Sequence, residues 1–228
     1  MRIITKSELE QRPELYQEIS ETLENDGIIC FPVGSSYRLA TPFLSPKAVV
    51  RFQQIKKRTK KSPVLAFISN REMLGQLTDD ISHQANALLT QFWPGPLTLL
   101  FELNREIPKK LKKSLNAKGK VGIRVPQDDL ALEILSTFDA PLLISSANVT
   151  KKAGSYSEAQ IRKNFGRWID ILISDGDQQG QQRSTIVDAS GASPIVLREG
   201  SLATQDLLAA LAGAGSDSVS LPSSPPAM

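Results

Sequence analysis

Residues 121–145 read VGIRVPQDDLALEILSTFDAPLLIS, and the order of patterns in this stretch decides the fold. Residues 121–125 and 142–145 are short apolar runs, which predict two buried strands. Between them, residues 130–138 have the apolar spacing of a short helix. Strands that alternate with helices in this way indicate an α/β fold.

The same alternation continues in both directions along the chain. Helices are predicted near residues 15–23, with Gly27 as a C-terminal cap, and from Ser45 and Pro46 onward. Further helices are predicted over residues 81–92 and 157–165, and further strands over residues 28–31, 63–68, 97–103, 169–173, 185–187 and 195–197. The sequence therefore predicts helices packed around one twisted, mixed sheet.

Composition is that of a globular protein with some basic surface. The chain has 228 residues, of which 40% are hydrophobic and 22% charged. We expect one domain over residues 1–212 and a disordered tail over residues 213–228, which are rich in Gly, Ser and Pro. The net charge is only +3, but lysines and arginines gather at residues 56–61 and 109–113. Such clusters either bind a polyanion or are simply solvated surface.

Several classes of protein are excluded. Cys30 is the only cysteine, which rules out an intrachain disulfide and a Cys-rich zinc site. His83 is the only histidine, so a Ser-His-Asp hydrolase would depend on it alone. P-loop, GxGxxG and HExxH motifs do not occur. Because apolar runs stay below roughly 18 residues and the first residues are charged, we expect a cytoplasmic protein with no membrane partner.

Cations lie at the ends of predicted elements. Lys56 and Arg58 close the helix that begins at Ser45; they could converge on a triphosphate or merely complement the helix dipole. Arg124 interrupts an apolar strand and needs a carboxylate partner, either from the protein or from a ligand. Arg198 closes the last predicted strand.

Small polar residues accompany these cations. Ser146 and Asn148 end one strand, and they suit contacts to phosphate or ribose as well as an ordinary turn or helix cap. Ser184 opens a later strand. Because open α/β sheets present their sites at strand ends, these residues are candidates for one site. The turn WPGPLT at residues 93–98 predicts a structural anchor instead.

Taken in order, the motifs resemble the YrdC-like family of threonylcarbamoyl-AMP synthases. The motifs are WPGPLT, GIRVP at residues 122–126, SAN at 146–148, STIVD at 184–188 and LREG at 197–200. The resemblance spans roughly residues 10–210. It implies an α/β fold in which a twisted mixed sheet, flanked by helices, carries an electropositive concave cavity.

The resemblance also implies a reaction and its site. L-threonine, bicarbonate and ATP would be combined, with Mg²⁺ carried by the ATP, and the product would pass to threonylcarbamoyl transferase proteins that modify tRNA. A nucleotide site and a threonine site are implied, the first built by Lys56, Arg58, Ser146, Asn148 and Arg198, the second by Ser35, Tyr37, Arg124 and Ser184.

The first motif departs from the family pattern P-T-[ED]-T-x-Y-G-L. This chain has Val33, Gly34 and Arg38 where the family has threonine, an acidic residue and glycine. Two alternatives to a threonine-specific synthase therefore stand. One is a non-catalytic relative that binds tRNA, or double-stranded or structured RNA, through a basic concave face. The other is an ATP-using enzyme that acts on a different small amine or amino acid.

Overall fold

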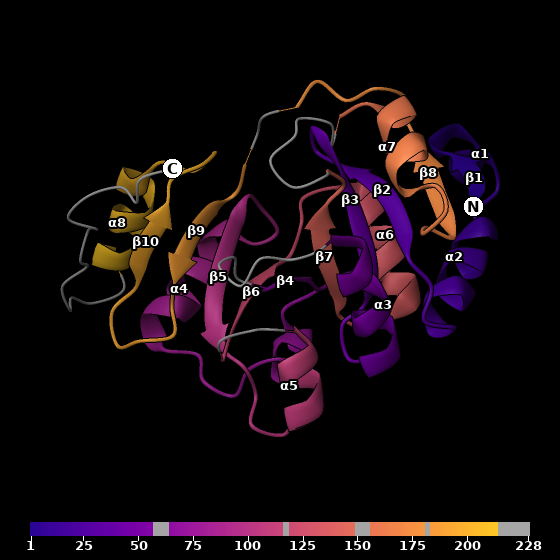
Figure 1. Ribbon diagram of the computed structural model, residues 1–228. Helices are drawn as coiled ribbons and strands as arrows, with labels where there is room; N and C mark the ends of the chain where they lie inside the picture. Colours follow the sequence, from indigo (N-terminus) through magenta and orange to yellow (C-terminus); the bar gives the residue numbers. More distant parts are fainter. Residues whose placement is uncertain (57–63, 116–118, 149–155, 181–182, 214–228) are drawn as a thin grey trace.

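The fold is built on one large mixed sheet. The computed structural model describes residues 1–56, 64–115, 119–148, 156–180 and 183–213. Within these ranges, ten strands form a sheet in the order β1-β8-β2-β3-β7-β4-β6-β5-β9-β10 (Figure 1). The strands are β1 (Arg2–Thr5), β2 (Ile29–Val33), β3 (Ser36–Pro42), β4 (Val64–Phe67), β5 (Leu97–Glu102), β6 (Lys120–Arg124), β7 (Leu142–Ser146), β8 (Ile171–Ser174), β9 (Thr185–Asp188) and β10 (Ile195–Arg198).

Helices connect most of the strands. In the described part of the chain they are α1 (Lys6–Gln11), α2 (Leu15–Glu24), α3 (Pro46–Lys56), the 3₁₀ turn η1 (Glu72–Gln76), α4 (His83–Phe92), α5 (Lys109–Leu115), α6 (Asp129–Phe138), α7 (Glu158–Phe165) and α8 (Thr204–Gly213). None of these helices is long and apolar enough to cross a bilayer.

The pairing of the strands confirms the predicted twisted mixed sheet. β1 and β8, β2 and β8, β4 and β6, and β5 and β9 pair in parallel. The other neighbours, including β3 with both β2 and β7, pair antiparallel. Each predicted strand and helix is present, with ends shifted by a few residues. The sequence patterns missed β1, β3, α1, η1, α5 and α8.

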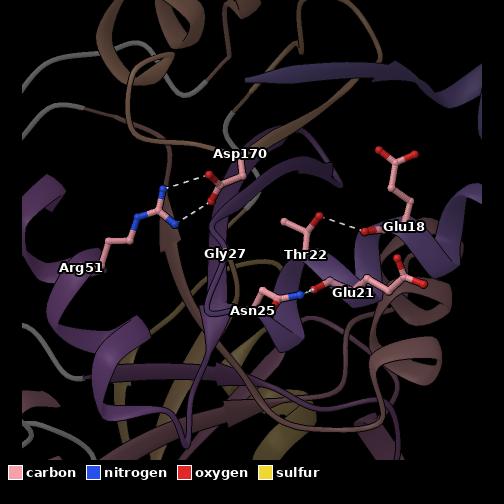
Figure 2. Close-up of a pocket in the computed structure, with 7 residues that line it drawn as sticks. All are labelled: Glu18, Glu21, Thr22, Asn25, Gly27, Arg51 and Asp170. Carbon is pink, nitrogen blue, oxygen red and sulfur yellow. Dashed lines mark hydrogen bonds and ion pairs between the residues drawn. The ribbon is translucent and has the colours of Figure 1, made fainter.

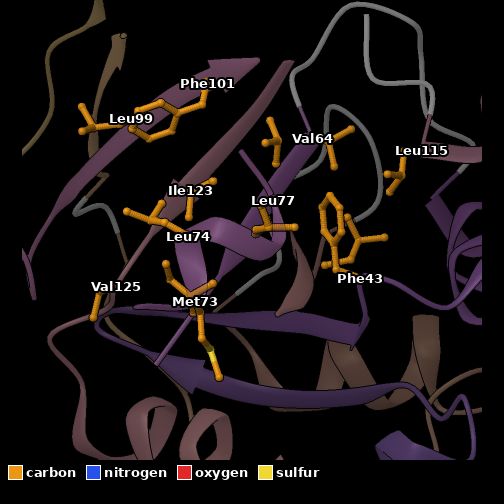
Figure 3. Close-up of a cluster of buried hydrophobic side chains, with 14 of the residues drawn as sticks. Phe43, Val64, Met73, Leu74, Leu77, Leu99, Phe101, Leu115, Ile123 and Val125 are labelled. Atoms are coloured by element: carbon orange, nitrogen blue, oxygen red, sulfur yellow. The ribbon is translucent and has the colours of Figure 1, made fainter. Parts of the chain in front are cut away.

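Two hydrophobic clusters cover the two faces of the sheet. The first contains side chains of α3, α4, α5, α7 and α8, and Figure 3 shows Met73 and Leu74 of η1 beside Ile123 of β6 within it. The second contains side chains of α1, α2 and α6. No described residue of β5, β6, β9 or β10 belongs to this second cluster. On that face, these four strands are free to carry polar side chains.

Helix ends follow the local signals in the sequence. Helix α4 begins after Ser82, whose hydroxyl accepts a hydrogen bond from the Ala85 amide at 3.1 Å. After α2, the Gly27 amide donates to the Thr22 carbonyl at 2.8 Å. A Cβ atom at Gly27 would lie 2.4 Å from that same oxygen, so the predicted cap position requires glycine.

Cys30 lies in the core, with 0% of its surface exposed. Burial raises the pKa of its thiol, because the apolar surroundings disfavour the thiolate. We therefore expect the folded protein not to react with 5,5′-dithiobis(2-nitrobenzoate), whereas one thiol should react after unfolding in guanidinium. Rapid labelling of the native protein would contradict this buried placement.

Candidate functional site

The register of the sheet places several of the candidate side chains on one face. Arg38 of β3 pairs with Ser146 of β7. Toward the β10 edge of the sheet, Ile186 of β9 pairs with Thr98 of β5 on one side and with Arg198 of β10 on the other. Arg124 pairs with Phe67 of β4, a member of the second hydrophobic cluster. Because side chains alternate along strands, Arg38 and Arg124 project from the same face of the sheet. A register shift between Val196 and Arg198 places Arg198 opposite Ile186 and so on this face too, which we call the arginine-bearing face.

Arg124 is held by contacts that leave its charge without a paired carboxylate. Its Nε donates to the Gly95 carbonyl at 2.7 Å, and its guanidinium carbon lies 5.7 Å from the centre of the Phe67 ring. Burial, followed by the positive charge of Arg38, lowers the pKa of Arg124 to about 10, and Asp128 opposes this only partly. Among the described residues, Arg124 forms no ion pair with a carboxylate. Of the two partners considered for this arginine, a ligand carboxylate is therefore favoured.

Arg198 and Ser184, which the resemblance assigned to the nucleotide and threonine sites, lie together. Nη2 of Arg198 donates to the Ser184 carbonyl at 2.8 Å. The Ser184 hydroxyl accepts from the Thr98 hydroxyl at 2.9 Å. The pKa of Arg198 is lowered, first by partial burial and then by the charge of Arg183. Two hydroxyls and the Arg198 guanidinium are thus gathered where β5, β9 and β10 meet, and the charge of Arg183 acts on them.

The turn at residues 146–148 adds further polar groups. The Ser146 hydroxyl donates to Oδ1 of Asn148 at 2.6 Å, and both residues are half-buried. The Ala147 amide donates to the Tyr37 carbonyl at 3.0 Å, which fixes the turn against β3. The hydroxyl of Ser146 therefore lies next to Arg38 on the arginine-bearing face.

Tyr37 and Ser35 have a different placement from the arginines. Tyr37 belongs to the first hydrophobic cluster, on the opposite face, and is 0% exposed. Its hydroxyl donates to the Gly176 carbonyl at 2.8 Å and accepts from the Asp175 amide at 3.0 Å, and burial raises its pKa to about 12. The Ser35 carbonyl accepts from the Gly180 amide at 2.9 Å. Both residues therefore form hydrogen bonds with the backbone that follows β8. Their assignment to a threonine site stays a prediction.

The predicted basic pair, Lys56 and Arg58, lies at the edge of the described residues. Lys56 is the last residue of α3, but its side chain is not described, and Arg58 lies outside the described residues. Their assignment to the ATP phosphates stays a prediction. His83 is exposed at the start of α4, and α5 carries the lysines of the second basic cluster.

Three residues near the arginines were missed by the sequence analysis. Arg183 lies close enough for its charge to lower the pKa of Arg38 and Arg198. Thr98 was assigned only to a structural turn. Asp128 accepts from the Ala131 amide at 3.1 Å and from the Gly34 amide at 3.0 Å. Only Asp128 carried a local signal, as the N-cap of the helix predicted over residues 130–138.

A separate pocket, of about 390 Å³, lies away from these residues (Figure 2). It is lined by Glu18, Glu21, Thr22, Asn25, Gly27, Arg51 and Asp170. Two guanidinium nitrogens of Arg51 donate to the carboxylate of Asp170 at 2.7 and 3.0 Å, and the Ile28 amide donates to the same group at 2.8 Å. Because Arg51 is already paired, this pocket is better explained as part of the framework.

Replacing Asp170 by alanine should therefore affect stability. Arg51 and Asp170 are each 38% exposed, so we expect a loss of about 1–2 kcal/mol at neutral pH. Burial alone would raise the pKa of Asp170, but the hydrogen bonds from Arg51 and Ile28 lower it overall. The ionised Asp170 carboxylate contributes fully to the free energy of unfolding above its unfolded-state pKa of about 3.9. This contribution is lost as the pH falls through the lower pKa of Asp170 in the folded protein.

Urea denaturation at several pH values tests this prediction. The difference in unfolding free energy between the wild-type protein and Asp170→Ala should shrink as the pH falls below about 4. Asp80→Ala, which removes an exposed carboxylate, is the matched control. A difference that stays constant down to low pH would contradict the role of the ionised carboxylate.

Comparison with known proteins identifies similar chains. A family model named Sua5/YciO/YrdC, described as telomere recombination, matches residues 21–200. A threonylcarbamoyl-AMP synthase of Pyrococcus abyssi is 28% identical over 180 residues, which cover 79% of this chain and 52% of that protein. The chain thus spans about half the length of that relative. An uncharacterised Haemophilus influenzae protein is 28% identical over 192 residues, covering 83% of this chain and 91% of that protein.

Solved structures share the fold. Pyrococcus abyssi Sua5 in complex with L-threonine has a TM-score of 0.79 at 24% identity, covering 92% of this chain and 60% of that one. Escherichia coli YciO has a TM-score of 0.75 at 21% identity, covering 86% of this chain and 94% of that one. At these identities the similarity establishes the arrangement of the sheet and helices.

Proposed function

The chain belongs to the Sua5/YciO/YrdC family, and on this premise we propose that it is an L-threonylcarbamoyladenylate synthase. The amine of L-threonine would combine with bicarbonate to give a carbamate and water. A carbamate oxygen would then attack the α-phosphorus of ATP, and pyrophosphate would leave. The product, threonylcarbamoyl-AMP, would be used by threonylcarbamoyl transferase proteins that modify tRNA. The similarity to a protein named threonylcarbamoyl-AMP synthase supports this proposal.

The observation that carries the proposal is the state of Arg124. This guanidinium is partly buried at the end of β6 and forms no ion pair among the described residues. A buried cation without an anion is costly, and an α-carboxylate would neutralise it with two parallel hydrogen bonds. The neighbouring hydroxyls of Thr98 and Ser184 offer further contacts for a small polar substrate.

The remaining residues would bind the nucleotide. Arg198, Ser146 and Asn148 would contact ATP, and Lys56 and Arg58 are proposed to hold its phosphates. Mg²⁺ would arrive bound to the ATP as part of the substrate; among the described residues no group of three or more His, Cys, Asp or Glu could hold a metal ion. The protein would act by positioning two anionic reactants and neutralising their charge, which requires no histidine base.

Pyrophosphate release from ATP and bicarbonate tests the proposal, measured with and without L-threonine. We expect release to depend on both L-threonine and bicarbonate, and mass spectrometry to detect threonylcarbamoyl-AMP. A panel of other amino acids should stimulate release less. Release stimulated best by another amino acid, or ATP binding without turnover, would contradict the threonine assignment.

One observation supports a second function, the binding of RNA. Helix α5 carries Lys109, Lys110, Lys112 and Lys113, and three of these residues are exposed. Exposed lysines contact phosphates without reading sequence, so affinity for a double-stranded RNA should fall steeply with salt. The double variant Lys109→Ala/Lys110→Ala should weaken binding equally for different RNA sequences. Affinity that is insensitive to salt or to this variant would exclude the helix as an RNA contact.

A further inference from the structure

Arg38 occupies a central position on the arginine-bearing face. Strand β3 lies between β2 and β7 (Figure 1), and Arg38 pairs with Phe31 on one side and Ser146 on the other. Phe31 is fully buried, whereas Ser146 is half-buried and polar. The guanidinium therefore extends from an apolar base toward the polar groups proposed to bind the nucleotide.

Arg38 differs from its neighbours because it lacks a partner. Arg124 donates to the Gly95 carbonyl, and Arg198 donates to the Ser184 carbonyl. Nε of Arg38 is buried and has no hydrogen-bond acceptor, and no ion pair of Arg38 occurs among the described residues. A buried donor left unsatisfied costs free energy, and a charged one costs more.

The charges around Arg38 increase this cost. Burial is the largest cause of its lowered pKa, and the positive charges of Arg198 and Arg183 lower the pKa further. Only the Tyr156 side chain opposes this effect. No carboxylate contributes, in contrast to Arg124, whose charge is partly offset by Asp128. The positive charges of Arg38, Arg183 and Arg198 thus act on one another, and no carboxylate is among the groups that shift the pKa of Arg38.

We propose that Arg38 is a phosphate-binding residue which, together with Arg198 and Arg183, holds the pyrophosphate group that leaves ATP. A guanidinium matches phosphate oxygens with two parallel hydrogen bonds, and three such groups suit an ion with several negative charges. A phosphate chain fits this place better than a second amino-acid carboxylate, because Arg38 pairs with Ser146 and its charge acts on that of Arg198, both of which are proposed to bind the nucleotide. This inference rests on the proposed function, since pyrophosphate is the product of that reaction.

Calorimetric titration of the full chain with inorganic pyrophosphate tests the inference without any turnover. Arg38→Met keeps most of the side-chain volume but removes the charge, and it should weaken pyrophosphate binding by about 10- to 100-fold. Arg38→Lys keeps the charge but loses the paired donors, so its affinity should be intermediate. Arg105→Ala, an exposed arginine beyond the far end of β5, should bind pyrophosphate like the wild-type protein.

Thermal unfolding provides a second readout that a merely structural role would not produce. Because Arg38→Met removes an unpaired buried charge, the ligand-free variant should melt at the wild-type temperature or above. Added pyrophosphate should raise the melting temperature of the wild-type protein but not that of the variant. The affinity for L-threonine should fall much less than the affinity for pyrophosphate, because Arg38 acts on Arg124 only through its charge.

The outcomes separate this inference from the proposed function. If no threonylcarbamoyl-AMP forms but pyrophosphate binding still depends on Arg38, the proposed function fails and the phosphate site stands. If Arg38→Met binds pyrophosphate like the wild-type protein, the inference is overturned whatever the activity. It is also overturned if the variant instead loses affinity for a dicarboxylic amino acid such as L-aspartate.

Discussion

Replacing Arg124 by alanine is expected to raise the KM for L-threonine by about 100-fold while leaving ATP binding nearly unchanged. The variant would leave the substrate carboxylate in a partly buried site without its counter-charge. The large size of the effect follows from burial, which lowers the pKa of Arg124 and strengthens its attraction to an anion. Initial rates of pyrophosphate release at varied L-threonine, together with ATP titrations, measure both quantities.

A conservative variant guards against a purely structural explanation. Arg124 also donates to the Gly95 carbonyl and packs over Phe67, so its loss could disturb the turn at residues 93–98. Arg124→Lys keeps the charge but removes the planar fork, and it should recover part of the L-threonine affinity. Equal losses of ATP and L-threonine affinity in Arg124→Ala would argue that the residue supports the whole site instead.

Replacing Gly200 by alanine is expected to destabilise the protein by about 2–3 kcal/mol and to weaken nucleotide binding. A Cβ atom there would lie 2.2 Å from the Arg183 carbonyl oxygen and 2.7 Å from that of Ser184. These are backbone atoms, so no change of rotamer relieves the overlap and the two segments must separate. The Ser184 carbonyl accepts the hydrogen bond of Arg198, so the separation would also displace that guanidinium.

Urea denaturation and ATP titration test this prediction. The matched control is Gly191→Ala, because a Cβ at Gly191 meets no atom within 4 Å. The control should change the unfolding free energy by less than about 0.5 kcal/mol. Unaltered stability of Gly200→Ala would show that the chain near residues 183 and 184 moves aside at little cost.

The local patterns of the sequence predicted most of the secondary structure. Ser45 with Pro46 marked the start of α3, and Gly27 marked the end of α2, because a capping hydroxyl and a residue without Cβ act on their immediate neighbours. Strand β3 was missed, because Ser36, Arg38 and Thr41 interrupt the apolar pattern that identifies a buried strand. In the sheet it is central, paired on both sides.

The candidate site was predicted only in part. Arg124, Ser184 and Arg198 became candidates because each stands at one end of an apolar strand, and the order of motifs indicated the family. Thr98 and Arg183 were missed because their importance depends on neighbours far away in the sequence. Alternation along β3 places the side chain of Tyr37 on the opposite face from Arg38, which its motif did not show, and its assignment to the threonine site stays a prediction.

By itself, the sequence determined the order of strands and helices, their caps and the residue types at strand ends, since propensity, periodicity and capping depend on residues close in the chain. Only the tertiary structure decided which strands are neighbours and which side chains share a face. Pairing of β3 with β7, for example, buries both faces of the sheet at once. This non-local packing brings Arg183 and Arg198 near Arg38 and leaves that guanidinium without an anion among the described residues.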